Sequence, residues 1–278
     1  MAAKVPVQND IATNTIGKHI FGLDTKGYQL GRPEYPEGLY AYLRNRGALF
    51  SNCRVFEVGP GTGQATRRLL AENVVTLAAI EPDPALAGNL RHACGDALAL
   101  KVINSGIENA PLEQVSFDLG VAATSFHWVD QAKGLAAAMQ LLKPNGYWAM
   151  WWNILHDPVH DLFSFEVLPL LKGVDLPPSL SGEMHEHYAL QVNARLDDLR
   201  NAGFEATEYE VISTEVLMTA KQMRALYATF SMIRRLDETA REKTLSGIEA
   251  VVEKKFGGHV KRVFLTPLYL ARKPRNVS

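Results

Sequence analysis

Short apolar runs alternate with amphipathic segments over the first half of the chain. Residues 55–58 and 74–80 have the length and composition of buried parallel strands. A helical pattern begins at Gln64 between these two runs, and another covers about residues 84–92. Alternation of strand and helix predicts a doubly wound, parallel α/β sheet with right-handed crossovers.

The same alternation continues to residue 153. We expect a lead-in helix over 37–46, strands over 98–104, 117–123 and 147–153, and an amphipathic helix over 134–142 that stops at Lys-Pro-Asn-Gly, residues 143–146. Sheets of this kind bind ligands at the carboxyl ends of their strands. Segments that follow those strands should therefore meet in one crevice, namely Gly59, Glu81, the turn 105–108 and residues 125–128.

The second half of the chain has a less regular pattern. Residues 156–191 are rich in Pro, His and Leu and are expected to form an inserted cap. After them we expect a helix over 192–202, a strand over 208–216, helices over 220–234 and 238–256, and a final strand over 261–272 at a sheet edge. Residues 1–18 are polar without a period and suggest a tail. We interpret the chain as one domain, 1–278, with an N-terminal lid over 1–46 and an inserted cap over about 154–205.

Composition narrows the class of protein. The 278 residues are 47% hydrophobic and 21% charged, as in ordinary globular domains. The net charge of −1 gives no basic field that would favour nucleic acid or an anionic membrane as a partner. Cys53 and Cys94 are the only cysteines and lack metal-ligand spacing. With no signal-peptide pattern at the start, we expect a cytoplasmic protein.

The glycines after the first strand indicate the kind of ligand. Gly59, Gly61 and Gly63 alternate, whereas a dinucleotide fingerprint requires its third glycine at Gln64 or Thr66, and no P-loop lysine follows. Glu57 precedes these glycines and would repel a pyrophosphate but attract an ammonium group. Glu81, 18 residues after Gly63, suits two ribose hydroxyls. The pattern favours a nucleoside that carries an amino acid.

Three motifs carry a family resemblance. Residues 57–63 (Glu-Val-Gly-Pro-Gly-Thr-Gly), 81–83 (Glu-Pro-Asp) and 141–146 (Leu-Leu-Lys-Pro-Asn-Gly) resemble the class I S-adenosylmethionine (SAM) dependent methyltransferases. Residues 32–36, 125–130 and 229–231 resemble the small-molecule group around trans-aconitate and ubiquinone/menaquinone-pathway methyltransferases. The resemblance covers about 28–272. It implies SAM as cofactor and a Rossmann-like doubly wound seven-stranded sheet, mostly parallel with an antiparallel last strand, plus a helical cap.

The resemblance also implies roles for individual residues. Glu57 and Gly59 would face the methionine ammonium, and Gly61 and Gly63 would let the protein backbone pack against the cofactor. The other residues implied to hold it are Glu81 at the ribose, Pro82 or Asp83 beside the adenine, Ile107 and Glu108 over the adenine edge, and Thr124 at the end of the fourth strand. One departure is Gly106, because relatives often carry an acid there that contacts the adenine amine.

His127, Tyr28 and Arg32 are the candidate catalytic residues. His127 is expected near the transferred methyl as a general base, or as a ring packed beneath the cofactor. Arg32 is expected to pair with a carboxylate of the cofactor or of an acidic substrate, or to form a helix-cap salt bridge. The segment 28–35 suits either a lid or a packed lead-in to the sheet.

Our main hypothesis is a methyltransferase for a small organic acceptor such as a carboxylic acid, working as a monomer or homodimer. The alternatives are a methyltransferase for a macromolecule and a cofactor-binding relative without catalysis. We expect no metal, although histidines and acids cluster at 156–161 and 183–187, and we interpret them as polar cap residues. The acceptor's identity, and the choice among O-, N- and C-methylation, stay open.

Overall fold

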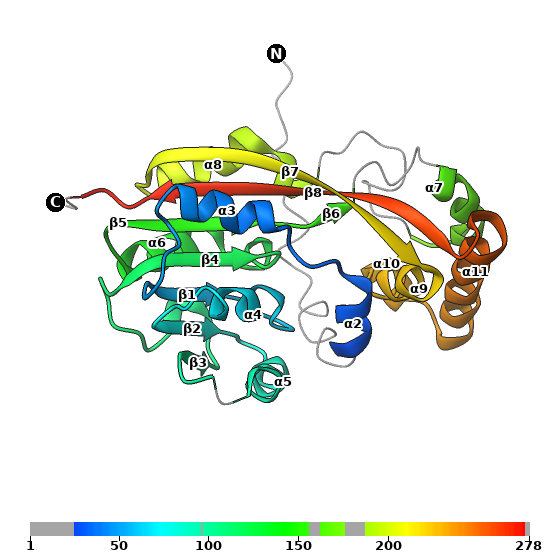
Figure 1. Cartoon of the computed structure of the whole chain (residues 1–278), viewed down its shortest axis with the longest axis horizontal. Coiled ribbons are helices and arrows are strands. Elements are labelled where there is room, and N and C mark those ends of the chain that lie inside the picture. The colour runs from blue at the N-terminus through cyan, green and yellow to red at the C-terminus, as the bar shows by residue number, and fades with distance from the viewer. Residues whose placement is uncertain (1–24, 96, 156–161, 176–186, 276–278) are drawn as a thin grey trace, which may run out of the picture.

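The structure is a computed structural model that describes residues 25–95, 97–155, 162–175 and 187–275 (Figure 1). A central sheet runs through it in the order β3-β2-β1-β4-β5-β8-β6, with β7 also paired to β8. The strands are β1 (Arg54–Val58), β2 (Thr76–Ile80), β3 (Leu100–Ile103), β4 (Phe117–Ala123), β5 (Leu142–Trp151), β6 (Ile154–Leu155), β7 (Glu205–Thr219) and β8 (His259–Arg272).

Pairing of the strands confirms the expected fold class. Strands β1 to β5 are parallel to their neighbours, and β8 runs antiparallel to β5. The sheet has eight strands, not the expected seven, because the two-residue β6 also pairs with β8. The expected edge position of the last strand is wrong, since β8 lies between β5 and the long strand β7.

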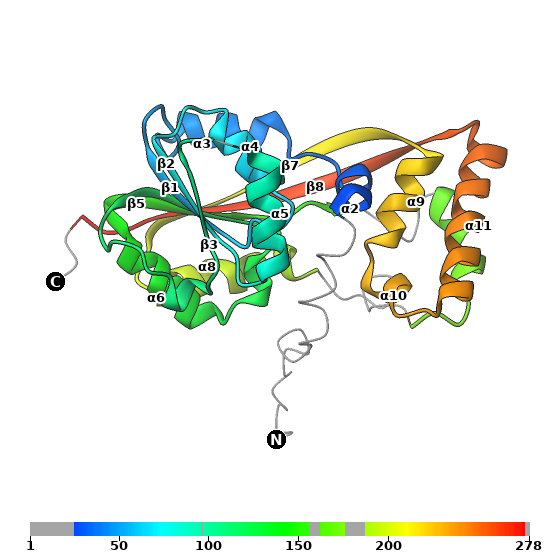
Figure 2. The same cartoon turned by 90° about the horizontal axis from the view of Figure 1, so that it is seen from below.

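Helices cover both faces of the sheet. Helices α3 (Glu37–Asn45) and α4 (Gln64–Leu70) bury Leu39, Leu43 and Leu69 against one face, whereas α6 (Gln131–Leu141) and α8 (Val192–Asn201) cover the other (Figure 2). Alternate residues of β1 supply the two cores, because Val55 points to the α3–α4 side and Phe56 to the α6–α8 side. Helix α5 (Pro84–Cys94) packs beside β3.

A second group of helices lies at the far end of the β7–β8 hairpin (Figures 1 and 2). We call it the helical lobe: α7 (Leu162–Val167), the 3₁₀ helix η3 (Leu168–Leu171), α9 (Ala220–Ala228), α10 (Ser231–Arg234) and α11 (Glu238–Phe256). These elements share a third core with Met218, Val260 and Phe264 of the hairpin. Helix α2 (Thr25–Gly31) packs on α9 so closely that a Cβ at Gly31 would lie 2.4 Å from the Ala225 backbone. The first described helix is thereby joined to this lobe.

Several boundaries differ from the expected ones. Strand β5 begins at Leu142, and the expected Lys-Pro-Asn-Gly helix stop lies inside it, where Asn145 has a positive φ of 63°. The helix expected over 220–234 is divided into α9 and α10 around Thr229. Within the expected cap, α8 packs against the main sheet through Leu199. The expected tail, 1–18, and most of the histidine and acid cluster lie outside the described residues.

Among the residues that the structure describes, no helix combines the length and the apolar character needed to cross a bilayer.

Candidate active site

The loop between β1 and α4 has a conformation that glycine favours. Gly59, Gly61 and Gly63 have φ values of 65°, 54° and 80°. A Cβ at Gly59 would lie 2.6 Å from Cβ of Ser125, whose hydroxyl donates to Val58 O. At Gly61, by contrast, a Cβ would meet nothing within 4 Å. The loop is therefore closely packed on the side of β4 and open at Gly61.

Glu57 is a fully buried acid in front of this loop. Its Oε2 accepts a 2.6 Å hydrogen bond from the Thr66 hydroxyl, whereas its buried Oε1 has no hydrogen-bond partner among the described residues. Burial raises the pKa of Glu57 to about 7, because water no longer solvates the charged form. An orphaned carboxylate oxygen of this kind requires a donor, and a cationic donor would fit best.

Glu81 is a second buried acid at the end of β2. Its carboxylate accepts the Gly61 N–H at 3.1 Å and the Asp83 N–H at 3.0 Å, so it joins the glycine loop to the start of α5. Burial raises the pKa of Glu81. Asn104 holds the neighbouring backbone, since its amide donates to Glu81 O at 2.8 Å and to Pro82 O at 3.0 Å. Glu57 and Glu81 thus lie near the carboxyl ends of the adjacent strands β1 and β2, and β1 borders the switch in strand order between β1 and β4.

The turn after β3 forms the next part of the crevice. Ile107 starts the 3₁₀ helix η1 (Ile107–Asn109) and is buried, whereas Glu108 is exposed. The Oε2 atom of Glu108 lies 2.9 Å from the place where a Cβ on Gly106 would be, so this acid occupies the space beside the glycine. In this chain the Glu108 carboxylate thus lies next to position 106, where relatives often carry an acid.

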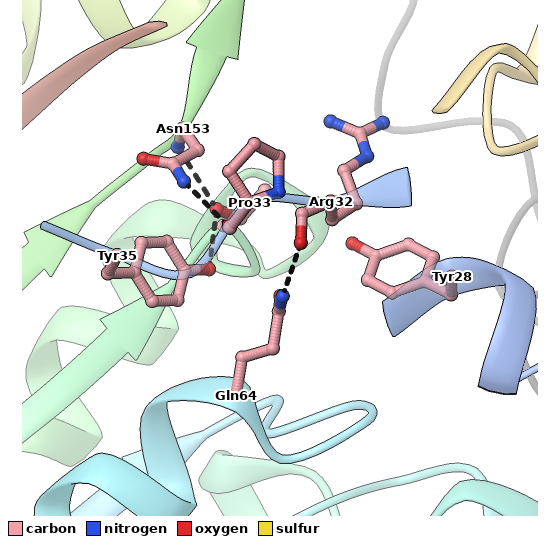
Figure 3. Close-up of a pocket in the computed structure, with 7 residues that line it drawn as sticks. Tyr28, Arg32, Pro33, Tyr35, Gln64 and Asn153 are labelled. Carbon is pink, nitrogen blue, oxygen red and sulfur yellow. Dashed lines mark hydrogen bonds between the residues drawn. The ribbon is translucent and has the colours of Figure 1, made fainter. Parts of the chain in front are cut away.

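The segment 29–35, which we call the lid segment, lies across the glycine loop and the ends of β4 and β5 (Figure 3). Four hydrogen bonds join it to the sheet domain: Gln29 Nε2 to Thr62 O at 3.3 Å, Gln64 Nε2 to Arg32 O at 2.9 Å, Asn153 Nδ2 to Pro33 O at 3.1 Å, and one between the Tyr35 and Thr124 hydroxyls at 2.9 Å. A pocket lies beneath this segment, lined by Tyr28, Arg32, Pro33, Tyr35, Gln64, Thr124 and Asn153. Both expectations for this segment, a lid and a packed lead-in to the sheet, stay predictions, since it lies over a pocket and is also hydrogen-bonded to the sheet domain.

Thr124 takes a strained conformation at the end of β4. Its φ is 54°, a value that residues with a branched Cβ rarely adopt. Its N–H donates to Trp151 O at 2.7 Å, and its hydroxyl meets Tyr35. Backbone strain held by surrounding contacts is frequent at ligand-binding positions.

His127 lies in the 3₁₀ helix η2 (Phe126–Trp128), just after Thr124. The indole N–H of Trp152 donates to His127 Nδ1 at 3.0 Å. Burial, with the nearby His187 and Arg32, lowers the pKa of His127 to about 3. Since an indole nitrogen only donates, Nδ1 must be the unprotonated nitrogen and the neutral ring carries its proton on Nε2. A general base needs a free lone pair, and neither nitrogen of this ring keeps one. The arrangement therefore suits the alternative expectation, a ring fixed in place by its contacts, better than a general base.

Arg32 and Tyr28 both line the pocket below the lid segment. Arg32 Nε donates to the Thr229 hydroxyl at 3.0 Å, and the guanidinium lies 5.4 Å from the Phe230 ring centroid. In Figure 3 this guanidinium points away from Gln64, and the Tyr28 hydroxyl points toward the lid segment. No salt bridge joins Arg32 to a carboxylate of the described residues. The expected helix-cap salt bridge is therefore not among its contacts there.

Several site residues were missed by sequence reasoning. Gln64, Asn153, Asn104, Trp152 and His187 contact the site but stand in no recognisable spacing. Gln64 directly follows the glycine loop, and Asn153 is the last residue of the strand expected over 147–153. An amide side chain at the end of a strand or directly after a glycine loop is therefore the signal that could have found them. His187 was noticed only within a supposed polar cluster.

Comparison with known proteins bears on the chemistry. Residues 56–150 match the sequence model described as a methyltransferase domain. An uncharacterised methyltransferase-like protein of Schizosaccharomyces pombe is 25% identical over 240 residues, which cover 84% of this chain and 86% of that one. An uncharacterised methyltransferase of Mycobacterium bovis is 33% identical over 133 residues, which cover 48% of this chain and 51% of the relative. The match thus spans about half of the mycobacterial protein.

A solved structure is similar at the level of the fold. Phosphoethanolamine N-methyltransferase 2 of Haemonchus contortus, in complex with phosphomonomethylethanolamine and S-adenosylhomocysteine, has a TM-score of 0.53 and 14% identity, with 90% of this chain and 57% of that chain covered.

The residues at the glycine loop fit S-adenosylmethionine as a cofactor. Glu57 offers a buried, unpartnered carboxylate oxygen for a cationic amine, Gly61 leaves open space at the loop, and Glu81 can accept from hydroxyl groups. These features, the domain match over 56–150 and the methyltransferase relatives show a SAM-dependent methyltransferase domain, and its cofactor is S-adenosylmethionine.

Proposed function

We propose that the protein methylates a small organic acceptor and that the acceptor is a carboxylic acid. The observation that carries this proposal is Arg32, a cation that lines the lid pocket and whose only side-chain hydrogen bond to a described residue, through Nε, goes to the neutral hydroxyl of Thr229. A guanidinium without a carboxylate partner among the described residues favours an anionic ligand, which it can bind through two parallel hydrogen bonds.

In this proposal the cofactor is held at the carboxyl ends of β1 and β2. Glu57 accepts from the ammonium, Glu81 accepts from the ribose hydroxyls, and the backbone of Gly59, Gly61 and Gly63 packs along the ligand. Pro82, Ile107 and Glu108 lie beside the adenine, and Thr124 lines the pocket below the lid segment. When bound, SAM supplies a methyl group on a positively charged sulfur, which is already a good leaving group.

The remaining task of the chain is alignment and exclusion of water. The lid segment supports this role, because its four hydrogen bonds reach the glycine loop and both neighbouring strand ends. Tyr28 and Arg32 are placed on the lid side of the pocket, where an acceptor would enter opposite the glycine loop.

The proposal extends to the class and organisation of the protein. We group it with the small-molecule methyltransferases that resemble the trans-aconitate and quinone-pathway enzymes, acting in the cytoplasm without nucleic acid or membrane partners, as a monomer or homodimer. The near-zero net charge supports a small acceptor rather than a polyanion. We propose one catalytic domain over 1–278, with a lid over 1–46 and cap elements over about 154–205; one continuous sheet from β1 to β8 supports this division.

A radiolabel transfer assay tests the proposal. Carboxylate, phenol and amine acceptors are incubated separately with methyl-labelled SAM and the full chain. The expected product is a methyl ester, recognised because mild base releases its label as methanol, whereas methyl ethers and methylamines resist this treatment. Label that appears only in base-stable products would contradict the carboxylic-acid proposal.

A further inference from the structure

We propose that Arg32, His127 and His187 form a binding site for the acceptor's carboxylate, built from hydrogen-bond donors and without a general base. The inference rests on the proposed function, since it assigns the residues that would recognise the acid. It adds a requirement: the reacting atom of the acceptor must arrive already deprotonated.

His127 supplies the first donor. Its Nδ1 is occupied by the Trp152 indole N–H at 3.0 Å, which leaves the ring proton on Nε2. Within the described ranges no residue accepts a hydrogen bond from this Nε2. Trp152 thus acts as a positioning residue, because it selects which nitrogen of His127 can donate to a ligand.

His187 supplies a second donor for the same reason. Its Nδ1 accepts the backbone N–H of Ala189 at 3.1 Å, at the start of the 3₁₀ helix η4 (Tyr188–Leu190). Its proton therefore also resides on Nε2. The following residue, Tyr188, has its ring centroid 6.2 Å from that of His127 and 5.6 Å from that of Trp152, so the residue next to His187 in the chain belongs to the aromatic cluster around His127.

Arg32 supplies the charge. Its Nε is held by the Thr229 hydroxyl at 3.0 Å, and that hydroxyl is itself held by Leu226 O at 2.7 Å. The two terminal guanidinium nitrogens have no acidic partner in the part of the chain that the structure describes. Thr229 thus orients the guanidinium and leaves its outer fork for a ligand.

Arg32 lines the pocket together with Thr124 and Asn153, which are close in sequence to His127 and its partner Trp152, and the charge of Arg32 acts on both histidines. Besides burial, the causes that lower the pKa of His127 are His187 and Arg32, and Arg32 likewise lowers the pKa of His187, to about 4. No described carboxylate contributes to either shift. Both imidazoles are therefore neutral at physiological pH, and Arg32 gives the site one positive charge.

The chemistry of such a site selects a class of acceptor. Carboxylic acids ionise near pH 4, whereas phenols and alkylammonium groups keep their protons to about pH 10 and would need a base. A carboxylate oxygen forms the new O–CH₃ bond while the C–S bond breaks and its electron pair goes to sulfur. No proton is transferred in this step. The ester product has lost its charge, so the donors hold it less tightly than the acid.

Nitrogen-15 NMR of the histidine-labelled full chain bound to S-adenosylhomocysteine tests the donor assignment. We expect His127 and His187 to be neutral Nε2–H tautomers at pH 7, and succinate, but not neutral succinamide, to shift both Nε2 signals. In Trp152→Phe the His127 ring should become a mixture of tautomers. An Nδ1–H tautomer of His127 in the wild type, or a ring that titrates near pH 7, would overturn the proposal.

Calorimetry with succinate tests whether the positive charge of Arg32 binds the carboxylate. Arg32→Met should reduce succinate affinity at least about tenfold, by loss of a charge-assisted contact, while S-adenosylhomocysteine affinity stays within about twofold. Arg32→Lys should recover part of the loss. Arg235→Met, at an exposed arginine after α10, is the matched control and should change neither affinity. Unchanged succinate binding by Arg32→Met would refute the assignment.

The two proposals can fail separately. If methyl esters form but Arg32→Met binds and methylates acids normally, the donor site is wrong and the proposed function stands. If succinate binds through Arg32 but no small acid is methylated, the site stands and the proposed function is wrong.

Discussion

The two sides of the active site have opposite electrostatic character. On the side of β1 and β2, the buried acids Glu57 and Glu81 flank the glycine loop. On the side of the lid segment, the positive charge of Arg32 acts on both His127 and His187, and no described carboxylate shifts either histidine pKa. An acidic half suits a cationic cofactor, and a half made of donors suits an anionic acceptor. In our proposal, this difference in charge is what would separate the two ligands within one crevice.

The halves also differ in how they are built. Glu57, the three glycines and Glu81 lie within one strand–loop–helix–strand unit of 25 residues. The other half takes Arg32 from α2's exit, His127 from η2, and His187 from the segment before α8, which lie far apart in sequence. We therefore expect substitutions in the first half to have the larger and more local effects, and the following changes test that ranking.

The largest effect is expected for Gly59→Val. A Cβ there would lie 2.6 Å from the Ser125 Cβ, and φ is 65°, which together should lower the free energy of unfolding by about 2–4 kcal/mol. We expect SAM affinity to fall about a hundredfold, since the loop must shift to relieve the clash. Calorimetry and urea unfolding measure the two quantities. Gly88→Ala, in α5 with nothing within 4 Å, is the control and should leave affinity unchanged.

Glu81→Ala should have the next largest effect. Loss of the carboxylate removes the acceptor for the ribose hydroxyls and frees the Gly61 and Asp83 N–H groups, so SAM affinity should fall at least about tenfold. Glu108→Ala, an exposed acid in η1, should cost much less. Normal affinity of Glu81→Ala would break the assignment of the acidic half to the cofactor.

The pH dependence of Glu57 gives an intermediate effect. Because burial raises its pKa from 4.5 to about 7, the carboxyl group stabilises the fold most below pH 4.5, and this contribution is lost as pH rises through 7. Relative to Glu57→Gln, the free energy of unfolding of the wild type should fall by about 3 kcal/mol between pH 4 and pH 8. Urea titrations of both proteins measure this difference.

Cofactor binding should show the opposite trend with pH. The ionised form of Glu57 attracts the ammonium of SAM, so affinity should rise from pH 6 to pH 8 and binding at pH 6 should release a proton. Calorimetry in two buffers with different ionisation enthalpies counts that proton. Identical heats in both buffers would exclude Glu57 as the partner of the ammonium.

The smallest effect is expected at the lid. Asn153→Ala removes the bond to Pro33 O and the acceptor for the Thr266 hydroxyl, and should cost about 1 kcal/mol of stability. We expect release of S-adenosylhomocysteine to become severalfold faster, which stopped-flow fluorescence can measure. Asn201→Ala, at an exposed position that ends α8, serves as the control. An unchanged release rate would mean that the lid segment does not retain the cofactor.

Much of the fold followed from local pattern. Strand β4 and helix α11 have the predicted limits, 117–123 and 238–256, because each is a long periodic segment with clear flanking residues. The position of β8 could not be obtained in this way. Its apolar pattern is compatible with an edge or a central strand, and only its pairing with both β5 and β7 decides between them.

The site residues likewise fall into a group that local sequence predicts and a group that depends on contacts between distant residues. Residues in the first βαβ unit were predictable, since the spacing of acid and glycine reflects contacts within a few residues of chain. The role of His127 depends on Trp152, 25 residues away, and the lid depends on Asn153 and Pro33, 120 residues apart. A hydrogen bond between distant residues leaves no periodic trace in a single sequence.

The sequence by itself determined the alternation of strands and helices, the conformation of the glycine loop and the charge of the cofactor half, because these depend on neighbours along the chain. The tertiary structure alone decided which nitrogen of His127 carries the proton, which carbonyl groups anchor the lid, and that Arg32 meets a hydroxyl rather than an acid. These features arise from packing α2, β5 and the α9–α10 connection together, and the free energy of such contacts depends on distances that only the folded chain sets.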